Sequence, residues 1–154
     1  MSIFSDYIAN ENKSENLRLA LTDSSYRNVT KDQTMAVNND LGTLGDAVLK
    51  LLQTEILYDD KVREISNERQ KYESDGVLVN KVARHYDLLR YLHFDEKDQE
   101  IKKDYNHSGK RKDPHKYIAT AMEAVLGAYY LDNGRDKERV KPVVEEWMEI
   151  CGQP

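Results

Sequence analysis

The stretch LGTLGDAVLKLLQTEILY, residues 41–58, decides the fold predicted for this chain. Its apolar side chains recur at intervals of three and four residues, which is the period of one face of an α-helix. That face is formed by Leu41, Leu44, Ala47, Val48, Leu51, Leu52 and Leu57. We therefore expect a long helix that packs against the core of the protein.

The same helix carries a carboxylate in an unusual setting. Asp46 lies beside Gly42 and Gly45, and each glycine inside a helix costs up to ~1 kcal/mol relative to alanine. Two such glycines indicate that another segment approaches closely. Asp46 also stands four residues before Lys50, the spacing of a surface ion pair. The sequence leaves open whether Asp46 is functional or pairs with Lys50 beside a tight helix crossing.

A second apolar helix, expected over residues 115–131, repeats this pattern. Within IATAMEAVLGAYYL (118–131) the one charged residue is Glu123, which shares a face with Thr120 and Gly127. A buried carboxylate needs a cationic partner or a metal ion. Glu123 could pair with a lysine or arginine at the edge of the core. If the two small-residue faces meet, Asp46 and Glu123 instead form an oxygen-ligand site for Mg²⁺, which suits phosphodiester hydrolysis.

The remaining pattern is helical as well, so the predicted class is all-α. No segment alternates with the period of two that a half-buried strand requires. Further helices are expected at about 17–21 with Ser14 as the N-cap, at 59–73, at 77–92 and at 136–150. Breaks are expected at residues 74–76 and 133–134, and Pro142 predicts a kink or a late start in the last helix. Trp147 is predicted to anchor that helix in the core.

Length and composition exclude several classes of protein. The 154 residues predict one domain over 1–154, with a short N-terminal extension at about 1–13. One cysteine excludes a disulfide framework and a multi-cysteine metal site. No apolar run approaches the ~20 residues of a membrane span, and no secretory signal is visible. We therefore expect a cytoplasmic protein that does not engage a membrane.

A local basic run stands out against the net charge of -5. Residues 102–116, KKDYNHSGKRKDPHK, hold six basic and two acidic residues and lead directly into the helix of Glu123. Such a run beside an acidic metal site could contact RNA phosphates, or it could be a solvated loop. The candidate RNA-binding residues are Lys110, Arg111, Lys112 and Lys116.

Four segments together resemble the ribonuclease III family. LGTLGDAVLKLLQTEILY resembles the family's signature helix, with LGDAVL intact at 44–49. LRLALTDSSY (17–26), GVLVNKVARHYDLLRYL (76–92) and AMEAVLGAYYLDNG (121–134) are similar to further family segments, in the family's order. NHSGKRKDPHKYIATAMEA (106–124) resembles the basic loop of the mini ribonuclease III subgroup, and the assignment to that subgroup stays open. The resemblance implies a ribonuclease III-type helical bundle without a double-stranded-RNA-binding domain.

The resemblance also implies a set of site residues. The family site has four acidic residues, of which this chain keeps Asp46 and Glu123 as the implied catalytic metal ligands. Gly42 and Thr120 stand where the family has the other two, and Lys50 stands where many relatives have glutamate. The secondary candidates are Asn39, Asp40 and Thr120.

Two functions follow from this resemblance. In the first, the chain is a Mg²⁺-dependent endoribonuclease, with Mn²⁺ able to substitute. It acts on double-stranded RNA as a symmetric homodimer in which each subunit cuts one strand. In the second, the chain is an inactive dimer of the same fold that serves as an RNA- or ribosome-associated structural module, bound to ribosomal RNA or a protein partner. The replacement of two of the four family carboxylates keeps the second function open.

Overall fold

The computed structural model describes residues 2–98 and 115–152. Within these ranges the chain is helical and contains no strand, and an isolated parallel bridge joins Thr22 to His93. The helices are α1 (Ile3–Ala9), α2 (Glu15–Ala20), α3 (Tyr26–Thr30), α4 (Asn39–Asp59), α5 (Ile65–Glu73), α6 (Asp75–Val77), η1 (Leu78–Ala83), η2 (Leu88–Arg90), α8 (Lys116–Asp132) and α9 (Lys137–Cys151). The all-α class predicted from the sequence is confirmed.

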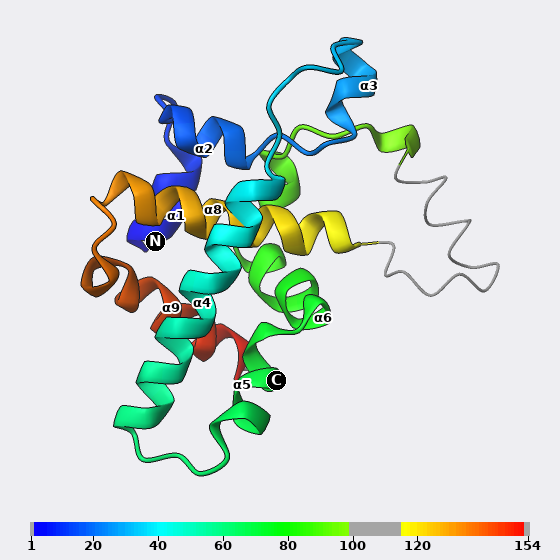
Figure 1. Cartoon of the computed structure of the whole chain (residues 1–154). Helices are drawn as coiled ribbons and strands as arrows, with labels where there is room; N and C mark the ends of the chain where they lie inside the picture. Colours follow the sequence, from blue (N-terminus) through cyan, green and yellow to red (C-terminus); the bar gives the residue numbers. More distant parts are fainter. Residues whose placement is uncertain (1, 99–114, 153–154) are drawn as a thin grey trace, which may run out of the picture.

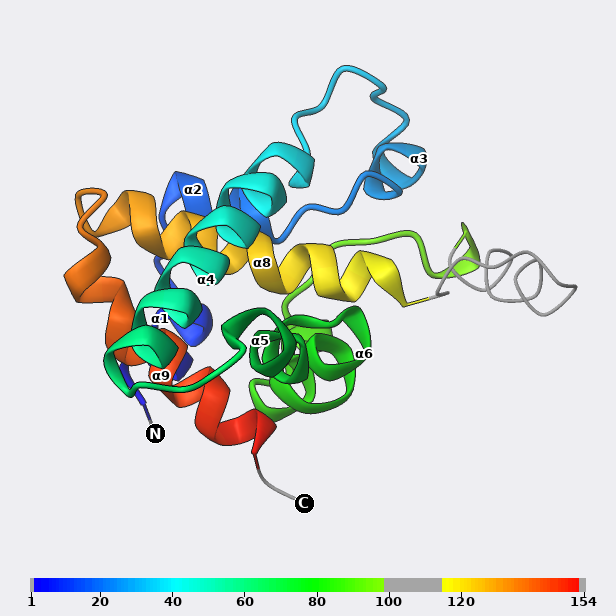
Figure 2. The ribbon, with the colours of Figure 1, turned by 60° about the horizontal axis from the view of Figure 1, so that its bottom comes forward.

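Helix α8 forms the centre of the fold, and α4 crosses it (Figures 1 and 2). From Ala121 to Tyr129, every residue of α8 except Glu123 is buried. A helix that is apolar around its whole circumference must be covered by other elements on all sides. Helices α2, α4, α9 and η1 provide that cover. The core is therefore assembled around α8, and Glu123 marks the place where this cover is open.

The crossing of α4 and α8 brings the two backbones into direct contact. A Cβ added to Gly45 would lie 1.7 Å from the backbone oxygen of Glu123. A Cβ added to Gly127 would lie 2.6 Å from the backbone oxygen of Leu41. No side chain fits at either position, so both helices must have glycine there. The close approach expected around Asp46 is confirmed, and its partner is the helix of Glu123.

The N-terminal segment belongs to the core, whereas the sequence suggests only an extension at about 1–13. Helix α1 buries Phe4 and Ile8 on one face. The ring of Phe4 packs edge-on against Trp147 at 5.6 Å and against Tyr129 at 5.5 Å between centroids. Trp147 is 1% exposed, as expected of a core anchor. The short helix α1 has too few apolar residues to show a period by itself, and the aromatic packing becomes visible only in the fold.

The predicted charged helix at 59–73 is wrong in its first third. Helix α4 continues to Asp59, and α5 begins only at Ile65. Between them Lys61 and Glu64 adopt left-handed backbone angles, with φ of +59° and +54°. Helix α5 has no buried residue, so little packing energy favours extending it toward its N-terminus.

The predicted helix at 77–92 is wrong in its second half. Its N-terminal part is present as α6 and the π-helical turn η1, but Asp87 has a φ of +53° and ends the regular helix. Residues 88–90 form the separate 3₁₀ turn η2. Leu78, Val82, Leu88 and Leu92 are buried, whereas Leu89 is 47% exposed. Leu88 and Leu92 thus reach the core from a separate turn after the break at Asp87, and not as part of one continuous helix face.

Several smaller predictions are confirmed at helix ends. The Ser14 side chain accepts a hydrogen bond from the backbone N–H of Leu17 and caps α2. Asn133 caps the C-terminus of α8, and Gly134 follows with a φ of +71°. Helix α9 contains Pro142 but begins at Lys137, so the late start considered for this helix is wrong. In the described ranges, none of the helices has the length and apolarity that a membrane span requires.

Replacing Gly45 with alanine is expected to destabilise the protein strongly, because the new methyl group overlaps the α8 backbone. Backbone cannot move aside as a flexible side chain can, so we expect a loss of about 3 kcal/mol or more in the free energy of unfolding. Urea denaturation followed by circular dichroism measures this loss. The matched control is Gly76→Ala, where an added Cβ meets no atom within 4 Å. Equal stability of the two variants would contradict the backbone contact.

Candidate metal centre

Asp46 and Glu123 meet where α4 and α8 cross. Asp46 directly follows Gly45, and Glu123 supplies the backbone oxygen that approaches Gly45 most closely. Their carboxyl groups hydrogen-bond to each other. The two small-residue faces that were expected to carry one carboxylate each therefore do meet, and the glycine contact is what brings them together.

The two carboxyl groups have pKa values shifted in opposite directions. Burial raises the pKa of Glu123 from 4.5 to about 9, and the hydrogen bond and negative charge of Asp46 add to this. Burial also acts to raise the pKa of Asp46, but hydrogen bonds from Glu123 and Lys50 outweigh it and lower that pKa below 3.8. Two like charges this close cannot both ionise easily. At neutral pH, without a cation, the Glu123 carboxyl stays protonated and donates a hydrogen bond to the Asp46 carboxylate.

A polar cavity of about 690 Å³ opens onto this pair. Of the secondary candidates, Asn39 and Thr120 line it, whereas Asp40 is exposed and lies outside the lining. Lys116 also lines the cavity. The other candidate RNA-binding residues, Lys110, Arg111 and Lys112, lie outside the described residues. The full lining is Asn39, Gly42, Thr43, Asp46, Lys50, Gln70, Glu73, Ser74, Asp75, Lys116, Thr120 and Glu123.

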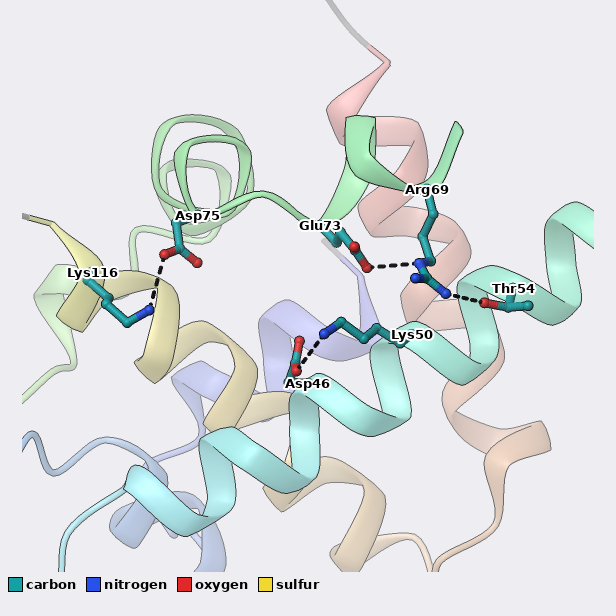
Figure 3. Close-up of polar contacts among 7 residues, drawn as sticks. All are labelled: Asp46, Lys50, Thr54, Arg69, Glu73, Asp75 and Lys116. Atoms are coloured by element: carbon teal, nitrogen blue, oxygen red, sulfur yellow. Dashed lines mark hydrogen bonds and ion pairs between the residues drawn. The ribbon is translucent and has the colours of Figure 1, made fainter. Parts of the chain in front are cut away.

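Two carboxylates at the corner between α5 and α6 also line this cavity, and sequence reasoning missed them. The Glu73 carboxylate pairs with Arg69, whose Nε lies 3.1 Å away. Asp75 pairs with Lys116, whose Nζ lies 3.5 Å from its Oδ2 (Figure 3). Both flank Ser74, at the helix break that the sequence predicts. The acidic residues on either side of that break are the one signal in the sequence that could have pointed to them.

Lys50 occupies the cavity side of α4 next to Asp46. Its Nζ lies 3.0 Å from Asp46 Oδ2, which confirms the ion pair considered from the spacing (Figure 3). The Lys50 and Asp46 side chains are 46% and 39% exposed. Such exposed pairs are screened by water and contribute at most about 1 kcal/mol to stability.

The donor set fits a hard divalent cation that keeps part of its water shell. Asp46 and Glu123 offer carboxylate oxygens, the ligands that Mg²⁺ and Mn²⁺ prefer. Among residues 2–98 and 115–152, no cluster of three or more His, Cys, Asp or Glu side chains is placed to hold a metal ion. Mg²⁺ commonly binds proteins through one or two carboxylates, with water completing its octahedron. The half-buried Glu123 carboxyl, which is costly to ionise alone, gains a compensating charge from such an ion.

Comparison with known proteins points to one family. The family model described as "Ribonuclease III domain" matches residues 39–134. Ribonuclease 3 of Syntrophomonas wolfei is 37% identical over 123 residues, which cover 78% of this chain and 48% of that protein. Ribonuclease 3 of Caldanaerobacter subterraneus is 35% identical over 137 residues, covering 87% and 56%. The chain thus spans about half the length of the curated relatives it matches.

Solved structures show the same fold over nearly the whole chain. The nuclease domain of ribonuclease III from Campylobacter jejuni superposes with a TM-score of 0.68 at 25% identity, covering 95% of this chain and 91% of that domain. A second structure of that domain, which describes flexibility in a region involved in dimer formation, also has a TM-score of 0.68, at 26% identity.

The proton held by Glu123 predicts how stability depends on pH in EDTA. Between pH 4.5 and about 9, folded Glu123 keeps a proton that the unfolded chain releases. Folding is therefore increasingly penalised as pH rises through this window. Glu123→Gln removes the penalty, so its melting temperature should exceed that of the wild type by a few degrees at pH 8 and by less at pH 5. Differential scanning calorimetry at both pH values measures this difference.

The matched control for this measurement is Glu145→Gln, at an exposed position of α9. It should follow the wild type at both pH values. A Glu123→Gln difference that does not change between pH 5 and pH 8 would show that Glu123 is ionised in the folded protein.

Proposed function

The chain belongs to the ribonuclease III family, and from this we propose that it hydrolyses phosphodiester bonds in double-stranded RNA, with one strand cut per subunit of a homodimer. The observation that carries the proposal is the hydrogen-bonded pair of Asp46 and Glu123 in a polar cavity at the α4–α8 crossing. A structural role alone would not require the fold to bury a carboxylate whose ionisation is so unfavourable. The pair is explained if a divalent cation compensates its charge.

Asp46 and Glu123 are the proposed ligands of Mg²⁺, for which Mn²⁺ can substitute. Glu123 must give up its proton when the cation binds, so the affinity for the cation rises with pH. Asp46 is already ionised and provides the first negative charge that attracts the ion. When bound, the cation supplies the positive charge that stabilises negative charge developing on a phosphodiester during hydrolysis. Asn39 and Thr120 lie at the same cavity and can hydrogen-bond water or phosphate oxygens.

The RNA is proposed to be held mainly through its phosphates. Lys116 stands at the cavity with its side chain 67% exposed, and Lys110, Arg111 and Lys112 precede it closely in the sequence. A positive side chain at the same cavity as the carboxylate pair, such as that of Lys116, would bind phosphates near the bond that is cut. Duplex RNA presents mostly shape, phosphates and 2′-hydroxyls, so little base specificity is expected.

An uncharged stripe on α4 supports the homodimer. Thr43, Ala47, Leu51 and Tyr58 are exposed and follow one another at helical spacing. Leu51 is 50% and Tyr58 73% exposed, which is unfavourable for side chains of this size unless another surface covers them. A second copy of the chain, packed symmetrically, would cover this stripe.

Cleavage of a labelled RNA duplex of a few tens of base pairs tests the proposed function. The wild type should cut the duplex with Mg²⁺ or Mn²⁺ and leave it intact in EDTA. Glu123→Gln and Asp46→Asn should each lower the rate at least ~100-fold, because each removes half of the negative charge that binds the cation. An intact duplex with every metal, from protein that still binds it, would instead support the inactive RNA- or ribosome-associated module.

The stripe on α4 gives a separate prediction about assembly. Leu51→Glu should convert the dimer to a monomer, because a charge would be buried without a partner in a symmetric contact. Light scattering at low micromolar protein concentration measures the mass. Leu89→Glu is the matched control, since Leu89 is also half exposed but lies on η2. A wild-type monomer, or a dimer that survives Leu51→Glu, would contradict this interface.

A further inference from the structure

Lys50 is a positive charge placed on one of the two carboxylates proposed to hold the cation. Its Nζ donates a hydrogen bond to Asp46 Oδ2 at 3.0 Å. The two residues are four apart on α4, so the helix itself keeps them within reach of each other. Both side chains are more than a third exposed. The helix therefore keeps the two side chains close together, but their ion pair can open without disturbing the core.

The neighbouring residues leave Asp46 as the hydrogen-bond acceptor of Lys50. Glu73 lies on the same cavity, but Arg69 already pairs with it through Nε at 3.1 Å. Arg69 is fixed in turn by a 2.9 Å hydrogen bond from Nη1 to Thr54 Oγ1 (Figure 3). Arg69 thus largely compensates the charge of Glu73, and the Lys50 ammonium forms its ion pair with Asp46.

Lys50 and a cation bound at the proposed site would both act on the carboxylate of Asp46. An ammonium group that donates a hydrogen bond to a carboxylate oxygen compensates part of its negative charge and so lowers the attraction of that carboxylate for a metal ion. An ammonium a few ångströms from a divalent ion is also repelled by it, with an energy that grows as water is excluded. Lys50 on Asp46 Oδ2 therefore opposes cation binding, and a bound cation favours turning the ammonium into the open part of the cavity.

We propose that Lys50 is a positioning residue that competes with the divalent cation for Asp46 and so sets the cation concentration at which the site fills. The proposal rests on the proposed metal site and adds the residue that controls its occupancy. Without a cation, Lys50 compensates the charge of Asp46. With a cation present, the same ammonium weakens binding, because it compensates part of the charge of Asp46 and because the two positive charges repel each other.

Mn²⁺ binding by the full chain tests this role without any measurement of activity. Electron paramagnetic resonance of free Mn²⁺ at neutral pH and about 0.15 M salt gives the dissociation constant. Lys50→Gln should bind Mn²⁺ roughly tenfold more tightly than the wild type, because one positive charge a few ångströms from a divalent ion is removed. Lys50→Arg keeps a positively charged side chain next to Asp46, so its dissociation constant for Mn²⁺ should stay within about twofold of the wild-type value.

Two further variants separate this proposal from its alternatives. Lys116→Gln removes a charge from the same cavity, but Lys116 pairs with Asp75 and not with a proposed metal ligand. Its Mn²⁺ affinity should change little, and tightening equal to that of Lys50→Gln would overturn direct competition. Glu123→Gln should lose the binding. Unchanged affinity in Lys50→Gln, together with loss in Glu123→Gln, would overturn the role of Lys50 and leave the metal site intact. Absence of binding in every protein would overturn both.

Discussion

The contact between the backbones of α4 and α8 is the constraint on which the rest of this structure depends. Gly45 and Gly127 allow the helices to approach until no Cβ fits between them. At that separation, the side chains that flank the glycines on the open side must meet, and these are Asp46 and Glu123. The same contact explains the glycine on the α4 side of α8. The rest of α8 is largely apolar because other helices cover it. Core packing and the candidate site are thus two consequences of one helix crossing.

The carboxyl groups that line the cavity at this crossing all have partners that reduce their negative charge. Asp46, Glu73 and Asp75 each have a basic partner, namely Lys50, Arg69 and Lys116. Glu123 instead hydrogen-bonds to Asp46 and keeps a proton. Gly42 and Thr120, at positions where the family resemblance implies acids, remove two further charges from the same place. A cation that entered would therefore meet little uncompensated negative charge and would have to displace the proton of Glu123. Occupancy of such a site would depend on pH through the Glu123 proton and would need a higher cation concentration than four free carboxylates would.

The long helices were predictable from sequence, because periodicity reports burial and α4 and α8 bury a continuous face. The failures occur where burial is not continuous. Helix α5 buries no residue, so its start is set by the left-handed turn at Lys61 and Glu64 and not by an apolar pattern. The helix predicted at 77–92 stops at Asp87 because the backbone reverses locally. Helix α1 is too short to carry a pattern, although Phe4 enters the aromatic core beside Trp147.

The sequence by itself determined the all-α class, the two central helices and the two carboxylates, since each depends on spacing along one helix. It also determined that something approaches closely at Gly42 and Gly45. Only the tertiary structure decided what approaches: Thr120 at Gly42 and the backbone of Glu123 at Gly45, on a helix more than seventy residues further along the chain. It also decided that the corner carrying Glu73 and Asp75 faces the same cavity and that Arg69 leaves Lys50 on Asp46. These relations join separate elements through side-chain contacts, and periodicity within one segment contains no information about the segment that it meets.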